Sequence, residues 1–150
     1  MGSLTQWVIE EAIRQLAEWE VRGLQVQLSV NISVDDLADD GLALRVTELL
    51  AHYRVSARQL IFEITESAIM HNPAQALSVL EQLRGCGISL SVDDFGTGYS
   101  SLAQLQRLPV QELKIDQSFV RNLDSTSGDG VIVRSTIEMS HNLGLKVVAE

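Results

Sequence analysis

Two hydrophobic periods alternate along the chain. Residues 4–19 place apolar side chains near helical spacing, which predicts an amphipathic helix. In residues 24–31, apolar and polar positions alternate one by one, which predicts a strand. The same reading predicts further strands at 60–65, 88–94, 111–116 and 146–150, and further helices at 35–54, 72–85, 101–108 and 131–143.

Strands and helices therefore follow one another in strict alternation. This order is typical of parallel sheets built from right-handed βαβ units, and it predicts the α/β class. No linker or low-complexity stretch divides the chain, so we expect one domain. A doubly wound sheet and a (β/α)8 barrel both fit this pattern.

Every predicted strand ends in a polar side chain that could bind a metal or a phosphate. These side chains are Asn31, then Glu63 and Glu66, then Asp93 and Asp94, then Lys114 and Asp116, and finally Glu150. Because the carboxyl ends of parallel strands lie on one face, we expect the side chains to converge there, where α/β proteins place their sites. A single acid after a strand is usually a turn former or a helix cap, and that alternative applies to each of them taken alone.

Two features resist that structural alternative. Glu63 lies inside an apolar strand, where a solvated charge is costly. Asp93 and Asp94 are adjacent, and two ionised carboxylates side by side are unfavourable without a cation. Carboxylate and amide oxygens suit Mg²⁺ or Mn²⁺, whereas the three histidines fall in predicted helices or helix-flanking turns and do not predict a zinc site. Adjacent carboxylates can serve two metals that cleave a phosphodiester, with Lys114 facing the same cluster.

Composition narrows the classes of function. Eleven basic and twenty acidic side chains give a net charge of −9, so the chain does not look like a DNA-binding protein, and a phosphate substrate would need metal ions to offset repulsion. One cysteine excludes an internal disulfide and favours a reducing compartment, the cytoplasm. No apolar run approaches the roughly 20 residues of a membrane helix. The first residues, 1–3, have the composition of an expression leader.

Two short motifs are misleading. Asp94-Phe95-Gly96 spells the kinase DFG, but the other kinase motifs are absent from the sequence. Glu11-Ala12-Ile13 resembles the motif that names the family below, but it lies inside the predicted amphipathic helix 4–19. Neither motif supports a function.

The chain resembles the EAL family of bacterial cyclic di-GMP phosphodiesterases from end to end. The resemblance is carried by LSVNIS, LIFEITES, SVDDFGTGYSSL, LPVQELKIDQSFV and LGLKVVAE. It implies a TIM-barrel-like (β/α)8 fold, of which residues 1–150 would supply about five of eight strands. It also implies hydrolysis of cyclic di-GMP to linear pGpG with two Mg²⁺ or Mn²⁺ ions, in bacterial signalling.

The resemblance also assigns roles to individual residues. It makes Asn31, Glu63 and Asp93 ligands of one metal, with Asp93 bridging to the second. Asp94 and Glu150 would lie at the second metal, and Glu150 would also be the general base. Lys114 would position the attacking water. Glu66 would hold the loop 95–101, which is linked in the family to metal binding and dimer formation.

Parts of the family pattern fall outside this sequence. The Glu-Ala-Leu segment with its metal ligand and the substrate-binding arginine would precede residue 1, and the final strand would follow residue 150. We therefore expect the 150-residue chain to be inactive alone and to form a homodimer through its open edges. A non-catalytic cyclic di-GMP receptor or interaction module is the alternative, and an unrelated metal-dependent aldolase or hydrolase barrel fits the strand ends but not the motifs.

Overall fold

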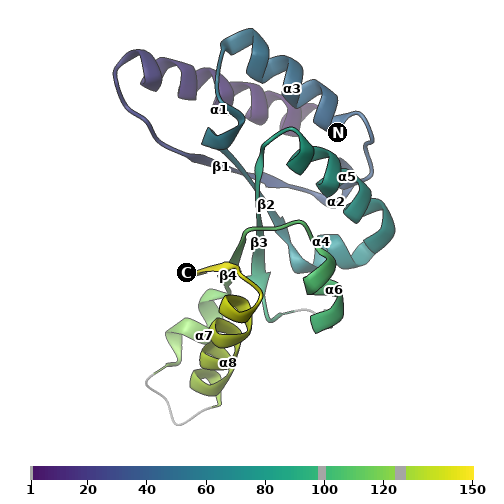
Figure 1. Ribbon diagram of the computed structural model, residues 1–150, viewed down its shortest axis with the longest axis vertical. Helices are drawn as coiled ribbons and strands as arrows, with labels where there is room; N and C mark the ends of the chain where they lie inside the picture. Colours follow the sequence, from purple (N-terminus) through teal and green to yellow (C-terminus); the bar gives the residue numbers. More distant parts are fainter. Residues whose placement is uncertain (1, 98–100, 124–127) are drawn as a thin grey trace.

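Five strands and the helices between them make up the described chain (Figure 1). The computed structural model describes residues 2–97, 101–123 and 128–150. The strands are β1 (Leu28–Ile32), β2 (Leu60–Thr65), β3 (Ser89–Phe95), β4 (Glu112–Ile115) and β5 (Lys146–Ala149). The helices are α1 (Ser3–Val21), α2 (Val34–Leu37), α3 (Leu42–Tyr53), α4 (Glu66–His71), α5 (Pro73–Gly85), α6 (Leu102–Arg107), α7 (Gln117–Arg121) and α8 (Asp129–Asn142), and a short 3-10 helix, η1 (Ala57–Gln59), precedes β2.

The strand order separates the two architectures that the sequence left open. All pairings are parallel, and the order across the sheet is β1-β2-β3-β4-β5. In a doubly wound sheet the order of the strands reverses at a switch point, whereas here each strand lies beside the strand that precedes it in the chain. Figure 1 shows the same progression, with α1 and α3 at one end of the molecule and α7 and α8 at the other. The predicted parallel βα repeats are confirmed, in the sequential order that a barrel requires.

The two faces of the sheet differ in chemistry. Register partners point to the same face, so Val30, Phe62 and Leu90 form one apolar row across β1, β2 and β3. These side chains are buried and belong to the core shared with the helices. The next row along the strands, on the opposite face, is polar throughout: Asn31, Glu63, Ser91, Glu112 and Lys146. The polar row lies on the face that would line the inside of a barrel.

Two predicted elements differ from the structure, and two helices of the structure were not predicted. The predicted strand 24–31 begins only at Leu28, because its neighbour β2 supplies no partner before Leu60. The predicted helix 35–54 is two helices, and the turn between them is stabilised by Asp39, whose carboxylate accepts the Gly41 amide at 2.9 Å. Short polar side chains compete with helical hydrogen bonds in this way. The helices α4 and α7 were not predicted at all.

The predicted helix signals near α5 and α8 are confirmed. The side chain of Asn72 accepts the Gln75 amide at the start of α5, and Pro73 occupies the first helical position. Gly144 follows α8 with a φ of +75°, a conformation that glycine adopts without strain. The loop 124–130 was predicted before this helix, and its residues 124–127 lie outside the described part of the chain.

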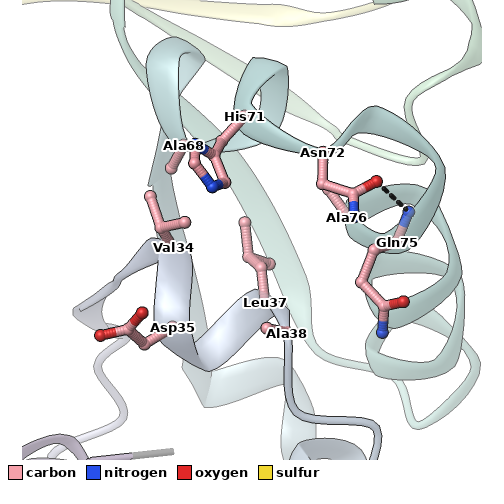
Figure 2. A pocket seen from close by; sticks show the side chains of 9 residues that line it. All are labelled: Val34, Asp35, Leu37, Ala38, Ala68, His71, Asn72, Gln75 and Ala76. Carbon is pink, nitrogen blue, oxygen red and sulfur yellow. Dashed lines mark hydrogen bonds between the residues drawn. The ribbon is translucent and has the colours of Figure 1, made fainter.

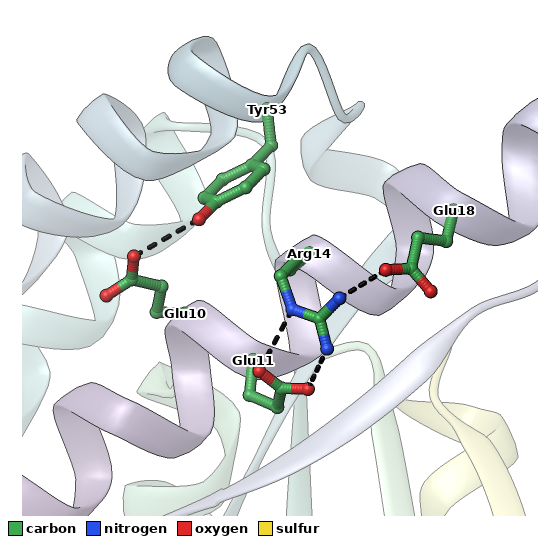
Figure 3. Close-up of polar contacts among 5 residues, drawn as sticks. All are labelled: Glu10, Glu11, Arg14, Glu18 and Tyr53. Atoms are coloured by element: carbon green, nitrogen blue, oxygen red, sulfur yellow. Dashed lines mark hydrogen bonds and ion pairs between the residues drawn. The ribbon is translucent and has the colours of Figure 1, made fainter.

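The misleading motif Glu11-Ala12-Ile13 lies within helix α1, with Ala12 and Ile13 buried in the core. Figure 3 shows Arg14 bridging Glu11 and Glu18 along the helix, while the Tyr53 hydroxyl of α3 donates to Glu10 at 3.2 Å. These contacts confirm that Glu11 is a helix-surface residue. None of the helices in the described ranges combines the length and the apolar character needed to cross a membrane.

Candidate metal centre

Three charged side chains meet at the carboxyl ends of β2, β4 and β5. The Lys114 ammonium lies 2.9 Å from Glu63 Oε1 and 2.8 Å from Glu150 Oε1, so it bridges a strand-end acid on each side. Glu63 is 8% exposed and the Lys114 side chain 17%, which makes this a largely buried ion pair. The sequence predicted that these strand ends converge, and the structure places Glu63, Lys114 and Glu150 together.

A β-bulge explains how two adjacent aspartates serve one site. Successive residues of a strand point to opposite faces, so Asp93 and Asp94 would normally diverge. Between the register pairs Val92–Leu113 and Phe95–Ile115, β3 has one residue more than β4. Asp94 sits in this irregularity with a φ of +53°, and its amide donates to Asp93 Oδ1 at 2.9 Å. The bulge turns both carboxylates toward the same side.

The left-handed backbone of Asp94 has a measurable cost. A side chain in this region costs about 1 kcal/mol relative to glycine. We therefore expect the free energy of unfolding of Asp94→Gly to exceed that of Asp94→Ala by about 1 kcal/mol, so that the glycine variant is the more stable one. Urea denaturation in metal-free buffer measures this difference. Both variants lose the carboxylate, so they differ only in backbone freedom. Equal unfolding midpoints would contradict the bulged conformation.

Asp93, Asp94 and Glu150 form the acidic cluster of the site. Each offers a carboxylate oxygen, and these oxygens all lie within 4.8 Å of one another. Burial raises the pKa of Asp93, and the charges of Asp94 and Glu150 add to the rise beyond what the Asp94 amide and Lys114 offset. Burial also raises the pKa of Asp94, together with its neighbour Asp116 and Glu150. The cluster is thus strained by its own negative charge, and an all-oxygen donor set of this kind suits a hard divalent cation.

Lys114 supplies the positive charge of the site. Burial alone would lower its pKa, but hydrogen bonds and charge interactions with Glu150 and Glu63 outweigh burial and raise the pKa above its ordinary value. The side chain is therefore a fixed ammonium at neutral pH, held by two carboxylates.

Asn31 and Glu66 occupy the flanks of the site. Asn31 is the register partner of Glu63 on β1, and its side chain is exposed on the polar face. Glu66 is 3% exposed, and its Oε2 accepts the Gly96 amide at 3.1 Å. This hydrogen bond reaches the start of the loop 95–101, whose residues 98–100 lie outside the described ranges.

Asp116 is one of the strand-end acids that the sequence pattern predicted to converge, and it lies near Asp94. It caps α7 by accepting the Ser118 amide at 2.8 Å, as a turn-forming acid would. Hydrogen bonds from Ser118 lower its pKa, and its carboxylate lies close enough to Asp94 to raise the pKa of that residue. The position after β4 was the available signal, but a pattern cannot show that a capping acid also contacts Asp94.

A small cavity lies apart from these residues. Its volume is about 180 Å³, and Figure 2 shows the side chains of Val34, Leu37 and His71 pointing toward one another there. None of the acids described above lines it. It is smaller than the roughly 300–1,000 Å³ of ordinary ligand pockets, so it does not compete with the acidic cluster as a binding site.

Several named proteins are similar to this chain over most of its length. It is 42% identical to the bifunctional diguanylate cyclase/cyclic di-GMP phosphodiesterase MucR of Pseudomonas aeruginosa, over 97% of this chain and 21% of the relative. It is 37% identical to the cyclic di-GMP phosphodiesterase PdeR of Escherichia coli, over 98% of this chain and 22% of the relative. The solved structure of the PaMucR phosphodiesterase in complex with c-di-GMP superposes with a TM-score of 0.91 at 41% identity, covering 97% of this chain and 60% of that one.

These matches cover this chain almost completely but only a small part of each relative. The chain spans about a fifth of the length of the curated relatives that it matches. The structural likeness confirms the TIM-barrel-like α/β fold expected from the motifs. The EAL domain family model matches residues 1–150, and the chain therefore belongs to the EAL domain family.

Proposed function

We propose that this chain is the catalytic part of a cyclic di-GMP phosphodiesterase, which opens cyclic di-GMP to linear pGpG. The observation that carries the proposal is the convergence of Asp93, Asp94 and Glu150 within 4.8 Å beside the Lys114 ammonium. Relatives named as cyclic di-GMP phosphodiesterases support the choice of substrate. An unrelated metal-dependent aldolase or hydrolase barrel would fit the same donor set, but it does not fit the motifs or the family match of this chain.

Two Mg²⁺ or Mn²⁺ ions are the proposed cofactors. Asp93, Asp94 and Glu150 would hold one ion, and Asn31 and Glu63 would join Asp93 around the other. Bound ions would lower the pKa of a water molecule and stabilise the departing oxygen of the phosphodiester. The mutual repulsion that raises the pKa of Asp93 and Asp94 supports this assignment, because a divalent cation would relieve it.

The protein's own groups would orient and deprotonate the nucleophile. Lys114 donates to Glu150 at 2.8 Å, so the ammonium fixes the position of the carboxylate that is the proposed general base. The same ammonium has one further N–H donor for a water molecule or a phosphate oxygen. Glu66 would act indirectly, by holding the backbone of Gly96 next to the paired aspartates.

The assay that tests the proposal is hydrolysis by the complete gene product. We expect it to convert cyclic di-GMP to pGpG with Mg²⁺ or Mn²⁺, and to stop when the metal is chelated. Tight binding without any conversion would establish the alternative, a receptor or interaction module, and would overturn the proposed activity. The 150-residue chain is expected to be inactive in the same assay, and turnover by it would show that residues 1–150 suffice for hydrolysis.

A homodimer is the proposed assembly of the 150-residue chain. Its two edge strands, β1 and β5, each present a row of backbone groups without a strand partner in the described sheet. The polar face between them carries Asn31 and Val148 exposed to solvent. We expect light scattering after size exclusion to give twice the chain mass at micromolar concentration. A well-folded monomer would contradict the dimer.

The cytoplasm is the proposed location. The single cysteine supports a reducing compartment, and Cys86 is a free thiol. Fractionation of cells that express the complete gene product would test it.

A further inference from the structure

The ring of Phe119 packs directly against the backbone of Gly96. Gly96 has a φ of +101°, and a Cβ added to it would lie 2.9 Å from Phe119 Cε2 and 3.4 Å from Cζ. No real Cβ makes so close a contact, so the ring occupies the space that any other residue at position 96 would need. Phe119 belongs to α7 and Gly96 to the turn after β3, so this contact joins two elements.

The Gly96 peptide is held from a second direction. Its amide donates to Glu66 Oε2 at 3.1 Å, and Glu66 is almost fully buried at the start of α4. A buried carboxylate and an aromatic ring thus fix one peptide unit between them. That peptide lies two residues after Asp94, whose own backbone is left-handed in the bulge. The position of Gly96 therefore limits where the Asp94 carboxylate can point.

Helix α7 touches Asp94 as well. Asp116, which caps α7, lies close enough to the Asp94 carboxyl to raise its pKa, and Phe119 follows one helical turn later. Helix α7 has only five residues and packs against α8. Phe119 is its only aromatic residue, and the ring is the side chain that joins the helix to the turn at Gly96. Helix α7 therefore approaches both neighbours of Phe95: its capping carboxyl lies near Asp94, and its Phe119 ring packs against Gly96.

We propose that Phe119 is a positioning residue for the paired aspartates, acting through Gly96 on the direction of the Asp94 carboxylate. The proposal rests on the proposed function for its consequence, which is the affinity of the acidic cluster for divalent cations. Removal of the ring would take away one of the two contacts that hold the Gly96 peptide within the described residues, so the turn could relax and the three carboxylates could separate. Leucine at position 119 would keep part of the contact.

Mn²⁺ titration of the chain, followed by electron paramagnetic resonance of the free ion, measures this consequence. We expect Phe119→Ala to weaken Mn²⁺ binding about tenfold, the lower range for residues that support metal ligands, and Phe119→Leu to recover most of the loss. Val120→Ala is the matched control, because Val120 is the next residue of α7 and is half-buried as well. It should lose stability without changing Mn²⁺ affinity. Equal affinities for Phe119→Ala and the parent chain would overturn the proposal.

A double-mutant cycle tests the contact without any metal. Gly96→Ala would clash with the ring, and Phe119→Ala would remove the clash, so the double variant should melt at a higher temperature than the sum of the single losses predicts. Additive losses would overturn the contact. A parent chain that binds no Mn²⁺ would overturn the proposed metal centre, whereas this cycle would still decide whether Phe119 sets the turn.

Discussion

Replacing Lys114 with methionine is expected to destabilise the metal-free protein and to make its stability depend on divalent cations. The ammonium lies within 3 Å of both Glu63 and Glu150, and its removal leaves two carboxylates facing each other in a largely buried site. Removing one partner of such an arrangement costs on the order of 2 kcal/mol or more. A divalent cation at the same carboxylates would offset the lost charge.

Thermal unfolding in EDTA and in Mn²⁺ measures both effects. Lys114→Met should melt well below the parent protein in EDTA, and Mn²⁺ should raise its melting temperature by more than it raises that of the parent. Lys146→Met is the matched control, because Lys146 is exposed on the same face of the sheet and has no ion pair within the described residues. Its melting temperature should stay close to that of the parent. A Lys114→Met protein that is as stable as this control would show that the bridge contributes nothing.

Replacing Asp93 with asparagine is expected to remove metal binding and activity together. Asp93 belongs to the cluster within 4.8 Å and is the proposed bridging ligand. Loss of a residue that merely supports a ligand costs about 10–100-fold in affinity or activity, so loss of a ligand should cost at least about 100-fold. Mn²⁺ titration and pGpG formation by the complete gene product check the two losses. Retained activity would show that Asp93 is not a ligand of the metal centre.

The same substitution should stabilise the metal-free protein in a pH-dependent way. Burial and neighbouring charges raise the pKa of Asp93 above its ordinary value of 3.8, so the folded state binds this proton more tightly than the unfolded state. The parent protein therefore loses stability as pH rises from about 3.8 through the raised pKa, and asparagine does not. The stability advantage of Asp93→Asn should be absent at low pH, grow across this window and then stay constant. An advantage that shrinks with rising pH would contradict the sign of the shift.

The strand ends were predictable because one physical rule governs them. The carboxyl ends of parallel strands share a face, so Glu63, Lys114 and Glu150 had to lie near one another once the alternation of strands and helices was read correctly. The buried carboxylate of Glu63 was also anticipated, since a charge inside an apolar strand needs a partner, and Lys114 is that partner.

The bulge at Asp94 was not predictable from the same pattern. A period of two assigns Asp93 and Asp94 to opposite faces, and only the extra residue in β3 brings them together. The helices α4 and α7 were missed because they have six and five residues, too few to show a period, and each is started by a local cap, Thr65 and Asp116. Tertiary contacts of this kind, including that of Asp116 with Asp94, leave no periodic trace.

The number of Mn²⁺ ions bound at the paired aspartates tests the two-metal site most directly. Electron paramagnetic resonance of the complete gene product with saturating Mn²⁺ distinguishes a coupled pair of ions from isolated ones. Two Mn²⁺ ions per chain with an exchange-coupled spectrum are expected, and Asp93→Asn should abolish the coupling because Asp93 is the proposed bridge. A single uncoupled ion per chain, or none, would contradict a two-metal centre at Asp93 and Asp94.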